Sequence, residues 1–252
     1  MTATRRATDT LIIAAVVLAV WKILHEIAGS TALPAPLATM AYLVHMVPTA
    51  RFAENAAATL KAFSLALLLA YGIGLAIGVW MGAHRLSGAV GEPILVVIYS
   101  LPKITLYPVL IAIFGLSPIP IVLIGVATAV VAMVIATLNG LDRVPRVLTK
   151  VARVHRLDAV TTAMTLQLPA AAPYLFTGVK LSVSYGFIAV IAAEFILSPA
   201  GLGRDIADAY SDFNNRRMYA LILFLLIIAT VVNTVLHALD VRWAERRSGD
   251  RT

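Results

Sequence analysis

Long apolar runs recur along the chain at a length that fits helices crossing a lipid bilayer. Such a helix needs about 20 mostly apolar residues. Six stretches reach or approach that length, namely 9–28, 60–83, 92–115, 118–139, 174–197 and 218–239. We therefore predict an all-α membrane protein with six transmembrane helices, in which residues 1–252 form a single transmembrane domain.

The first span is the weakest of the six because Lys22 and Glu26 interrupt its end. A lysine near a helix end can reach the membrane interface. Arg5 and Arg6 ahead of the apolar run resemble the start of a signal peptide, but no convincing small-residue cleavage site follows. We expect an uncleaved first transmembrane helix.

The third span is broken by Pro102 and Pro108, with Lys103 between them. Proline removes a backbone donor and kinks a helix, and a membrane tolerates such breaks only where protein or a water cavity satisfies the freed groups. The pattern predicts a broken helix that faces the interior of the bundle.

Gly74, Gly78 and Gly82 form a stripe of small residues on the second span. Glycines four residues apart let helices approach closely in lipid. Packing inside one bundle is the favoured interpretation, and contact with a second copy of the chain is the alternative.

Composition supports the bilayer and removes other classes of protein. The chain is 60% hydrophobic and 13% charged, whereas soluble domains carry about 25% charged residues. The formal charge of +7 is spread between apolar runs and at the chain ends, so nucleic acid is not expected as a partner. Cysteine is absent, and the five histidines lack metal-ligand spacing. We expect no catalytic residue, metal site or cofactor on this chain.

Lysine and arginine counts give the orientation. With the N-terminus inside, twelve of these residues fall in cytoplasmic segments and four fall outside, when Lys22, Lys61, Lys103 and Lys180 within or beside spans are left out. The pattern favours both termini in the cytoplasm. The external stretch 30–55 contains an amphipathic run at 37–47, which we expect to lie along the external interface.

The cytoplasmic stretch 140–173 predicts two short helices. Val147, Val151 and Val154 recur at helical spacing after Pro145. Asp158 fits the N-cap of a second helix that runs to Leu168 and that Pro169 ends. The apolar stripe of the first helix would bind a partner protein, pack under its own bundle, or lie beside lipid headgroups that its cations bind.

Several stretches resemble the permease subunits of binding-protein-dependent ABC importers, in particular the nitrate, sulfonate and taurine branch. The family's signature loop reads Glu-Ala-Ala, three residues, Gly, nine residues, Ile, one residue, Leu-Pro. Its counterparts here are Lys150-Val151-Ala152, Arg156, Leu166 and Leu168-Pro169, so the glutamate and the glycine are replaced. Further resemblances are Leu33 to Pro36, Tyr99 to Pro108 with Phe114-Gly115, Ala193-Glu194 with Gly201-Leu202-Gly203, and Trp243 with its flanking arginines.

This resemblance implies a type I ABC importer permease with six helices in a bacterial inner membrane. A coupling helix would lie between helices four and five. It also implies a second permease copy, two ATPase subunits that hold ATP and Mg²⁺, and an external solute-binding protein. The residues placed at the ATPase contact are Lys150, Val151, Ala152, Arg153, Arg156, Leu157, Asp158, Leu168 and Pro169. The branch transports small solutes such as nitrate, sulfonates and taurine.

Charged residues inside a span are expensive and are candidates for function. In the first interpretation, Lys103 with Tyr99 and Tyr107 lines a solute path that favours an anion. In the second, Lys103 has a structural role, in which it either satisfies the carbonyls freed by the prolines or pairs with Glu194. Glu194 is a fourth candidate for the path, or lies at the external mouth.

The three carboxylates Asp205, Asp208 and Asp212 follow the fifth span. We expect them to form a solvated face of an external loop or short helix, with contact to the solute-binding protein as the alternative.

The chain contains no Gly-x-x-x-x-Gly-Lys-Ser/Thr element, so ATP would be hydrolysed on another chain. The alternative function is a secondary transporter that couples through Glu194 or Lys103. Folds of that kind often show paired broken segments, and only the third span here is clearly broken.

Overall fold

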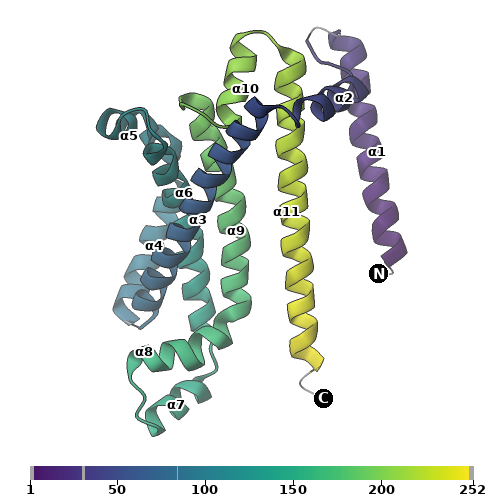
Figure 1. Ribbon diagram of the computed structural model, residues 1–252. Helices are drawn as coiled ribbons and strands as arrows, with labels where there is room; N and C mark the ends of the chain where they lie inside the picture. Colours follow the sequence, from purple (N-terminus) through teal and green to yellow (C-terminus); the bar gives the residue numbers. More distant parts are fainter. Residues whose placement is uncertain (1–2, 30–31, 84, 250–252) are drawn as a thin grey trace.

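In the computed structural model the backbone is described for residues 3–29, 32–83 and 85–249. Side chains are described for the same residues except 3–11, 85–89, 92 and 243–249. Within these ranges every regular element is a helix, as Figure 1 shows. The predicted all-α class is therefore confirmed for the described part of the chain.

Four helices are long and apolar enough to cross a membrane. They run through α3 (Ala50–Ala83), α6 (Pro118–Asp142), α9 (Leu168–Ile196) and α11 (Asn215–Gly249). The bent pair Pro93–Ser100 and Lys103–Phe114 makes a fifth span if it is counted as one. The first predicted span lies in α1 (Ala3–Ala28), and its residues 9–11 fall outside the described side chains. Several spans are thus found, and the count of six stays a prediction.

The third predicted span is broken between α4 (Arg85–Ser100) and α5 (Tyr107–Phe114), with a 3₁₀ turn at Lys103–Leu106. The two halves meet at 71°, which confirms the predicted break. The predicted interior position holds for one face of α4, where Leu95 packs against Met81, Val134 and Leu138, whereas Val96 and Val97 on its other side are 55% and 61% exposed. Tyr107, by contrast, is fully buried at the start of α5. Each half of the span therefore packs on the bundle with one face only.

The core forms where α3, α6 and α9 pack together. Small residues recur four apart on the buried face of α3, at Ala62, Ala66, Ala70, Gly74 and Gly78. A Cβ added to Gly74 would lie 2.7 Å from Met133 Cβ, and one added to Gly78 would lie 2.5 Å from Thr137 Cβ. Both neighbours belong to α6. The glycine stripe therefore packs inside one bundle, as the favoured interpretation predicts.

Short helices lie at the two opposite ends of this bundle (Figure 1). α2 (Pro36–Met46) and α10 (Leu202–Ser211) lie at one end, which is called the α10 end below. α7 (Arg146–Val154) and α8 (Ala159–Thr162) lie at the other, the α7 end. The predicted external and cytoplasmic segments thus fall on opposite ends of the molecule.

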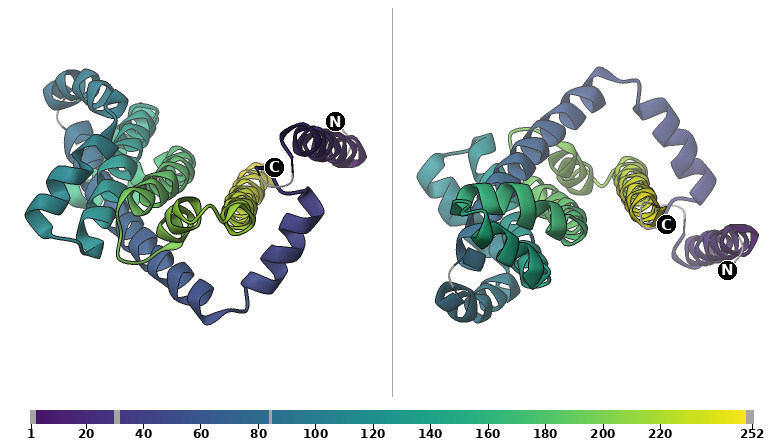
Figure 2. Two further views of the ribbon diagram at one scale, coloured as in Figure 1. Left: turned by 90° about the horizontal axis from the view of Figure 1, so that it is seen from above. Right: turned by 90° about the horizontal axis from the view of Figure 1, so that it is seen from below.

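α1 stands apart from the α3, α6 and α9 bundle, as both views in Figure 2 show. Among the described residues α1 contacts α2 and the segment that precedes it. Trp21 Nε1 donates to the carbonyl of Pro34 at 3.1 Å, and His25 Nδ1 lies 2.6 Å from the carbonyl oxygen of Leu33. Much of the described part of α1 is exposed, with Ile13 at 64% and Ile27 at 77%.

The predicted helix end at Pro169 is wrong. The chain continues from Ala159 through a π turn at Ala163–Gln167 into α9, and a single helical segment runs to Ile196. Pro169 lies directly after this π turn, in the first turn of α9. The wider π turn before it changes the hydrogen-bond register. The proline therefore marks an irregularity in the helix rather than its end.

Candidate functional site

The helix α7 lies outside the spans and offers an apolar stripe to its surroundings. Val147 and Val154 are 66% and 80% exposed, and Lys150 is exposed beside them. Ala152 is the one residue of α7 that is buried. A narrow contact therefore holds α7 to the bundle, and packing under its own bundle does not account for the valine stripe.

The turn after α7 requires a left-handed residue, and Arg156 supplies it with a φ of 51°. The N–H of Leu157 donates to the carbonyl of Ala152 at 2.9 Å, and the N–H of Arg156 donates to that of Arg153 at 3.2 Å. This pair of bonds is the Schellman helix end, which usually contains glycine at the left-handed position. Arg156 occupies the position of the glycine in the signature loop that the sequence resembles. The replaced glycine thus leaves the turn intact.

Asp158 caps α8, as the sequence predicts. Its Oδ2 accepts from the N–H of Thr161 at 3.0 Å and its Oδ1 from the Thr161 hydroxyl at 2.5 Å. These hydrogen bonds favour the ionised form and lower the pKa of Asp158 below its ordinary value of 3.8. Downstream, Leu168 is half-buried and Pro169 is exposed. Together α7, the Arg156 turn and α8 form a folded element at the α7 end.

Lys103 lies at the break in the third span, and its ammonium group forms hydrogen bonds with backbone carbonyls. Its Nζ donates to the carbonyls of Ile98, Tyr99 and Leu101 at 2.9, 3.2 and 3.4 Å. An ammonium group has three donors, so all of them are committed. This is the arrangement expected if Lys103 satisfies carbonyls freed by the proline break, and no ion pair joins Lys103 to Glu194 among the described residues.

The ring of Tyr99 packs edge-on against that of Tyr185, with centroids 5.6 Å apart. Tyr99 also lines a cavity of about 290 Å³ between α4, α6 and α9, called the Tyr99 cavity. Its polar lining residues include Asn139, Tyr174 and Thr177. The sequence offered no signal for these three residues, because each is a single polar residue in an apolar span.

Tyr107, on the second half of the broken span, contacts the end of α9, which contains Glu194. The Tyr107 hydroxyl donates to the carbonyl of Leu197 at 2.5 Å, three residues beyond Glu194. Glu194 lines a cavity of about 380 Å³ together with Glu54, Lys61 and other residues of α3, α6 and the segment after α9. The four residues predicted for the path thus form two groups, one at the break and one beside this Glu194 cavity.

Glu194 is 1% exposed and holds the start of α10. Its Oε2 accepts from the N–H of Gly203 at 3.0 Å and from the Thr59 hydroxyl at 2.8 Å. Thr59 Oγ1 in turn accepts from the N–H of Leu202 at 2.8 Å, and Asn55 Oδ1 accepts from the N–H of Gly201 at 3.0 Å. Side chains of α3 and α9 therefore cap α10 in place of a cap of its own.

The two glycines of Gly201-Leu202-Gly203 make this contact possible. A Cβ on Gly201 would collide with the Glu194 carboxyl group, and one on Gly203 with the carbonyl oxygen of Ile191. Gly201 also has a φ of 130°, which side chains disfavour. The spacing of Glu194 and the glycines, noted in the sequence, is thus one structural unit. Thr59 and Asn55 could not be found from the sequence, because they lie more than 130 residues away from their partners.

The predicted solvated face on α10 is wrong for Asp205, which is 1% exposed. Arg217 Nη2 lies 2.7 and 2.9 Å from its two carboxylate oxygens, and Arg51 Nη2 lies 3.2 Å from Oδ1. Asp208 pairs with Arg204 at 2.7 Å nearer the surface. Arg51 of α3 reaches both carboxylates from a distant part of the sequence, and Arg217 of α11 reaches Asp205 from the next helix. Asp212 is exposed, as predicted.

The part of the chain that contains most of these features matches a known protein family. The family model described as "Binding-protein-dependent transport system inner membrane component" matches residues 70–247, more than half of the chain. That range includes the break, the α7 element, Glu194 and α10. Trp243, part of the resemblance at the C-terminal end, falls within it but outside the described side chains.

Two curated relatives are permeases named for anions. A nitrate import permease protein of Leptolyngbya laminosa is 28% identical over 71% of this chain, and the match spans 64% of that protein's own length. A putative aliphatic sulfonates transport permease protein of Bacillus subtilis is 24% identical over 95% of this chain and 88% of that protein. Both relatives are transport proteins rather than enzymes.

A solved structure shares the fold. The MetNI methionine ABC transporter in an inward-facing conformation matches 73% of this chain and 91% of that chain, with a TM-score of 0.61 and 18% identity. At this identity the likeness concerns the fold alone.

Proposed function

Because the chain belongs to the family of binding-protein-dependent transport system inner membrane components, we propose that it forms the membrane path of an ATP-driven importer. One observation carries this proposal, namely that the family match at residues 70–247 includes the break, the α7 element, Glu194 and α10. The site residues outside the match all lie on α3 before residue 70, namely Arg51, Asn55, Thr59 and the α3 residues that line the Glu194 cavity. The permease would reside in a bacterial inner membrane with both termini in the cytoplasm.

The coupling element of the importer is α7 with the Arg156 turn and α8. Exposed valines beside Lys150 and Arg153 suit a groove on a partner protein that is apolar at its floor and acidic at its rim. Two ATPase subunits, which hold ATP and Mg²⁺, are the partners we propose for two copies of this chain. Motion of α7 would reach α9 through the Arg156 turn and α8, because the helical segment that begins with α8 continues from Ala159 to Ile196.

The solute path uses the two polar-lined cavities at opposite ends of the α3, α6 and α9 bundle. The Glu194 cavity lies at the α10 end and would receive solute from an external binding protein. The Tyr99 cavity lies towards the α7 end and would release it. A small anion is the proposed solute class, supported by the names of the nitrate and sulfonate relatives.

The experiment that tests this function is purification of the tagged chain, expressed with its neighbouring genes, followed by mass determination in mild detergent. We expect two copies of this chain with two ATPase chains. Recovery of the chain alone, or as a simple oligomer, under several mild conditions would favour an ion-coupled carrier and contradict the proposal.

A matched pair of variants locates the ATPase contact. Val147→Asp changes an exposed valine on α7, and Val44→Asp changes an equally exposed valine on α2 at the other end, with exposures of 66% and 64%. We expect the first variant to lose the ATPase chains during purification and the second to retain them. Equal retention of the ATPase chains by both variants would show that α7 does not contact the ATPase.

A further inference from the structure

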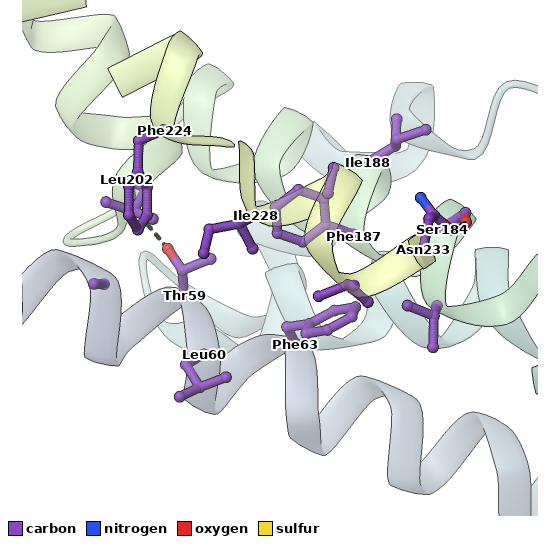
Figure 3. Close-up of a pocket in the computed structure, with 14 residues that line it drawn as sticks. Thr59, Leu60, Phe63, Ser184, Phe187, Ile188, Leu202, Phe224, Ile228 and Asn233 are labelled. Carbon is purple, nitrogen blue, oxygen red and sulfur yellow. Dashed lines mark hydrogen bonds between the residues drawn. The ribbon is translucent and has the colours of Figure 1, made fainter. Parts of the chain in front are cut away.

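A third cavity, of about 320 Å³, lies between α9 and α11 and has α3 as its floor. It is called the α9–α11 cavity here. Figure 3 shows side chains of all three helices directed into it, among them Phe63 of α3, Phe187 of α9 and Ile228 of α11. The rings of Phe63 and Phe187 pack edge-on with centroids 5.6 Å apart.

Polar contacts hold α9 and α11 together above and below this cavity. At the α10 end, Arg217 of α11 pairs with Asp205 of α10, and α10 is in turn capped by Glu194 of α9. Towards the α7 end, Lys180 of α9 pairs with Asp240 of α11. The two helices are therefore fixed at both ends, and the space between them is part of the fold.

The lining of the α9–α11 cavity does not suit a polar ligand. No charged residue contributes to it. The hydroxyl hydrogens of Thr59 and Ser184 are already donated, to Glu194 and to Asn233 Oδ1 respectively. An ordered water needs two to four polar partners, and most residues that line this cavity are apolar. The mostly apolar lining therefore suits an apolar occupant.

The surroundings of α11 supply such an occupant. α11 crosses the membrane, and only 11% of its most apolar window is buried inside the protein. Leu226 and Val235, on the outer face of the same stretch, are 61% and 51% exposed. At this depth the solvent is hydrocarbon. Lipid chains therefore have direct access to the seam between α9 and α11.

We propose that the α9–α11 cavity is a binding site for one acyl chain of a bilayer phospholipid. The chain inserts between the two helices and packs on Phe63, Phe187 and Ile228. Without the acyl chain, these side chains would have no atoms in contact on one side and would lose dispersion energy. The inserted chain supplies those contacts. The site does not depend on the transported solute.

The test uses the full chain with its partner subunits, reconstituted in vesicles of a phosphatidylcholine that carries a diazirine on one acyl chain. After irradiation, mass spectrometry locates the lipid adducts. We expect adducts on peptides that contain Phe187 and Ile228. Ala229 lines the cavity, and Ala229→Phe should lower this labelling about tenfold, the change expected when about two methylene groups lose their burial.

Ala238→Phe is the matched control, because Ala238 lies on an exposed face of α11 outside the cavity. This variant should leave the labelling unchanged. If Ala229→Phe fails to assemble, Ala229→Leu fills the same space with less bulk. Labelling of the outward-facing Leu226 without labelling of the lining residues would overturn the proposal, and so would equal labelling in the Ala229 variants and the control.

A second copy of the chain is the rival occupant, and a cysteine distinguishes it. The chain has no cysteine of its own, so Ala229→Cys introduces a single thiol. A covalent dimer of this variant on mild oxidation would place a second copy over the cavity and overturn the lipid site. A monomeric product, together with the expected labelling, supports it.

Discussion

Arg156 and Phe213 have φ values of 51° and 53°, in the left-handed region that side chains avoid. Each follows a helix whose end is closed by the same pair of bonds, at Ala152 and Arg153 for α7 and at Ala209 and Tyr210 for α10. The left-handed conformation costs a non-glycine residue about 1–2 kcal/mol. Both turns are retained because the helix ends gain two hydrogen bonds from them.

The first prediction concerns this strain. Arg156→Gly removes the left-handed penalty but adds about 0.5–1 kcal/mol of chain entropy in the unfolded state. We expect a net stabilisation of the α7 element of about 0.5–1 kcal/mol. Amide hydrogen exchange at residues 152–157 measures it. Phe213→Gly serves as the parallel case on α10, and faster exchange in Arg156→Gly would show that the arginine side chain itself holds the turn.

The second prediction concerns the close contact of Gly203 with Glu194. A Cβ at position 203 would lie 2.7 Å from Glu194 Cβ, and forced overpacking costs about 1–3 kcal/mol. We expect Gly203→Ala to lower the unfolding temperature of the purified protein. Gly72→Ala is the control, because no atom lies within 4 Å of the added Cβ and a helical alanine is favoured. An unchanged melting temperature for Gly203→Ala would contradict the assigned packing.

At the scale of elements, α10 illustrates how a short polar helix is fixed on an apolar bundle. Its first N–H groups are capped by Asn55, Thr59 and Glu194, and its Asp205 is enclosed by two arginines. Buried carboxylates are stable only when they are paired and hydrogen-bonded. α3, α9 and α11 therefore share one polar junction at the α10 end.

The third prediction tests this junction. Asp205→Asn leaves Arg217 without its counter-charge, and breaking a buried pair costs about 3 kcal/mol or more. Asp208→Asn, on the same helix, breaks a pair whose side chains are 33% and 39% exposed, and such pairs contribute below about 1 kcal/mol. Thermal unfolding of both variants measures the difference. Equal losses of stability in the two variants would show that the ion pairs of Asp205 are not desolvated.

The fourth prediction concerns the pH dependence of α8. Hydrogen bonds from Thr161 lower the pKa of Asp158 in the folded protein, so its contribution to stability is present above the unfolded pKa. That contribution is lost as the pH falls through the lowered folded pKa. Hydrogen exchange at residues 159–162 should therefore accelerate in acid. Asp158→Asn keeps an acceptor but does not titrate, and a pH profile with the same slope in this variant would assign the effect to another group.

At the scale of the whole molecule, many large apolar side chains are exposed along the spans. Exposed leucines, isoleucines and valines occur on α1, α3, α4 and α11 alike. Lipid covers such surfaces at the depth of the spans. α7 is different, because its exposed valines are beside cations and outside the spans.

The fifth prediction concerns assembly. The family pattern has a glutamate where this chain has Lys150, so the proposed ATPase partner should present an acidic group there. Lys150→Glu would place like charges together, and we expect retention of the ATPase during purification to fall about tenfold, or 1.4 kcal/mol. Arg216→Glu, an exposed reversal at the α10 end, should have no effect. Unchanged assembly and transport in Lys150→Glu would contradict the expected acidic group on the ATPase.

The coarse features of the fold could be read from the sequence because they depend on local patterns. The apolar runs, the break at Pro102 and Pro108, and the cap at Asp158 each lie within a few turns of helix. Contacts between distant residues had no such pattern. The solvated face expected for Asp205 failed for this reason, since the partners Arg51 and Arg217 reach it from other helices.

The sequence by itself determined that this chain crosses a membrane, that it resembles the importer permeases and that one span is broken. Those conclusions depend on hydropathy and on short motifs, which the bilayer and the backbone enforce locally. Only the tertiary structure decided that Lys103 donates to three carbonyls, that Glu194 holds α10, and that α9 and α11 enclose an apolar cavity. Each of these results from helices packing side by side, and residues far apart in sequence come into contact only when the chain is folded.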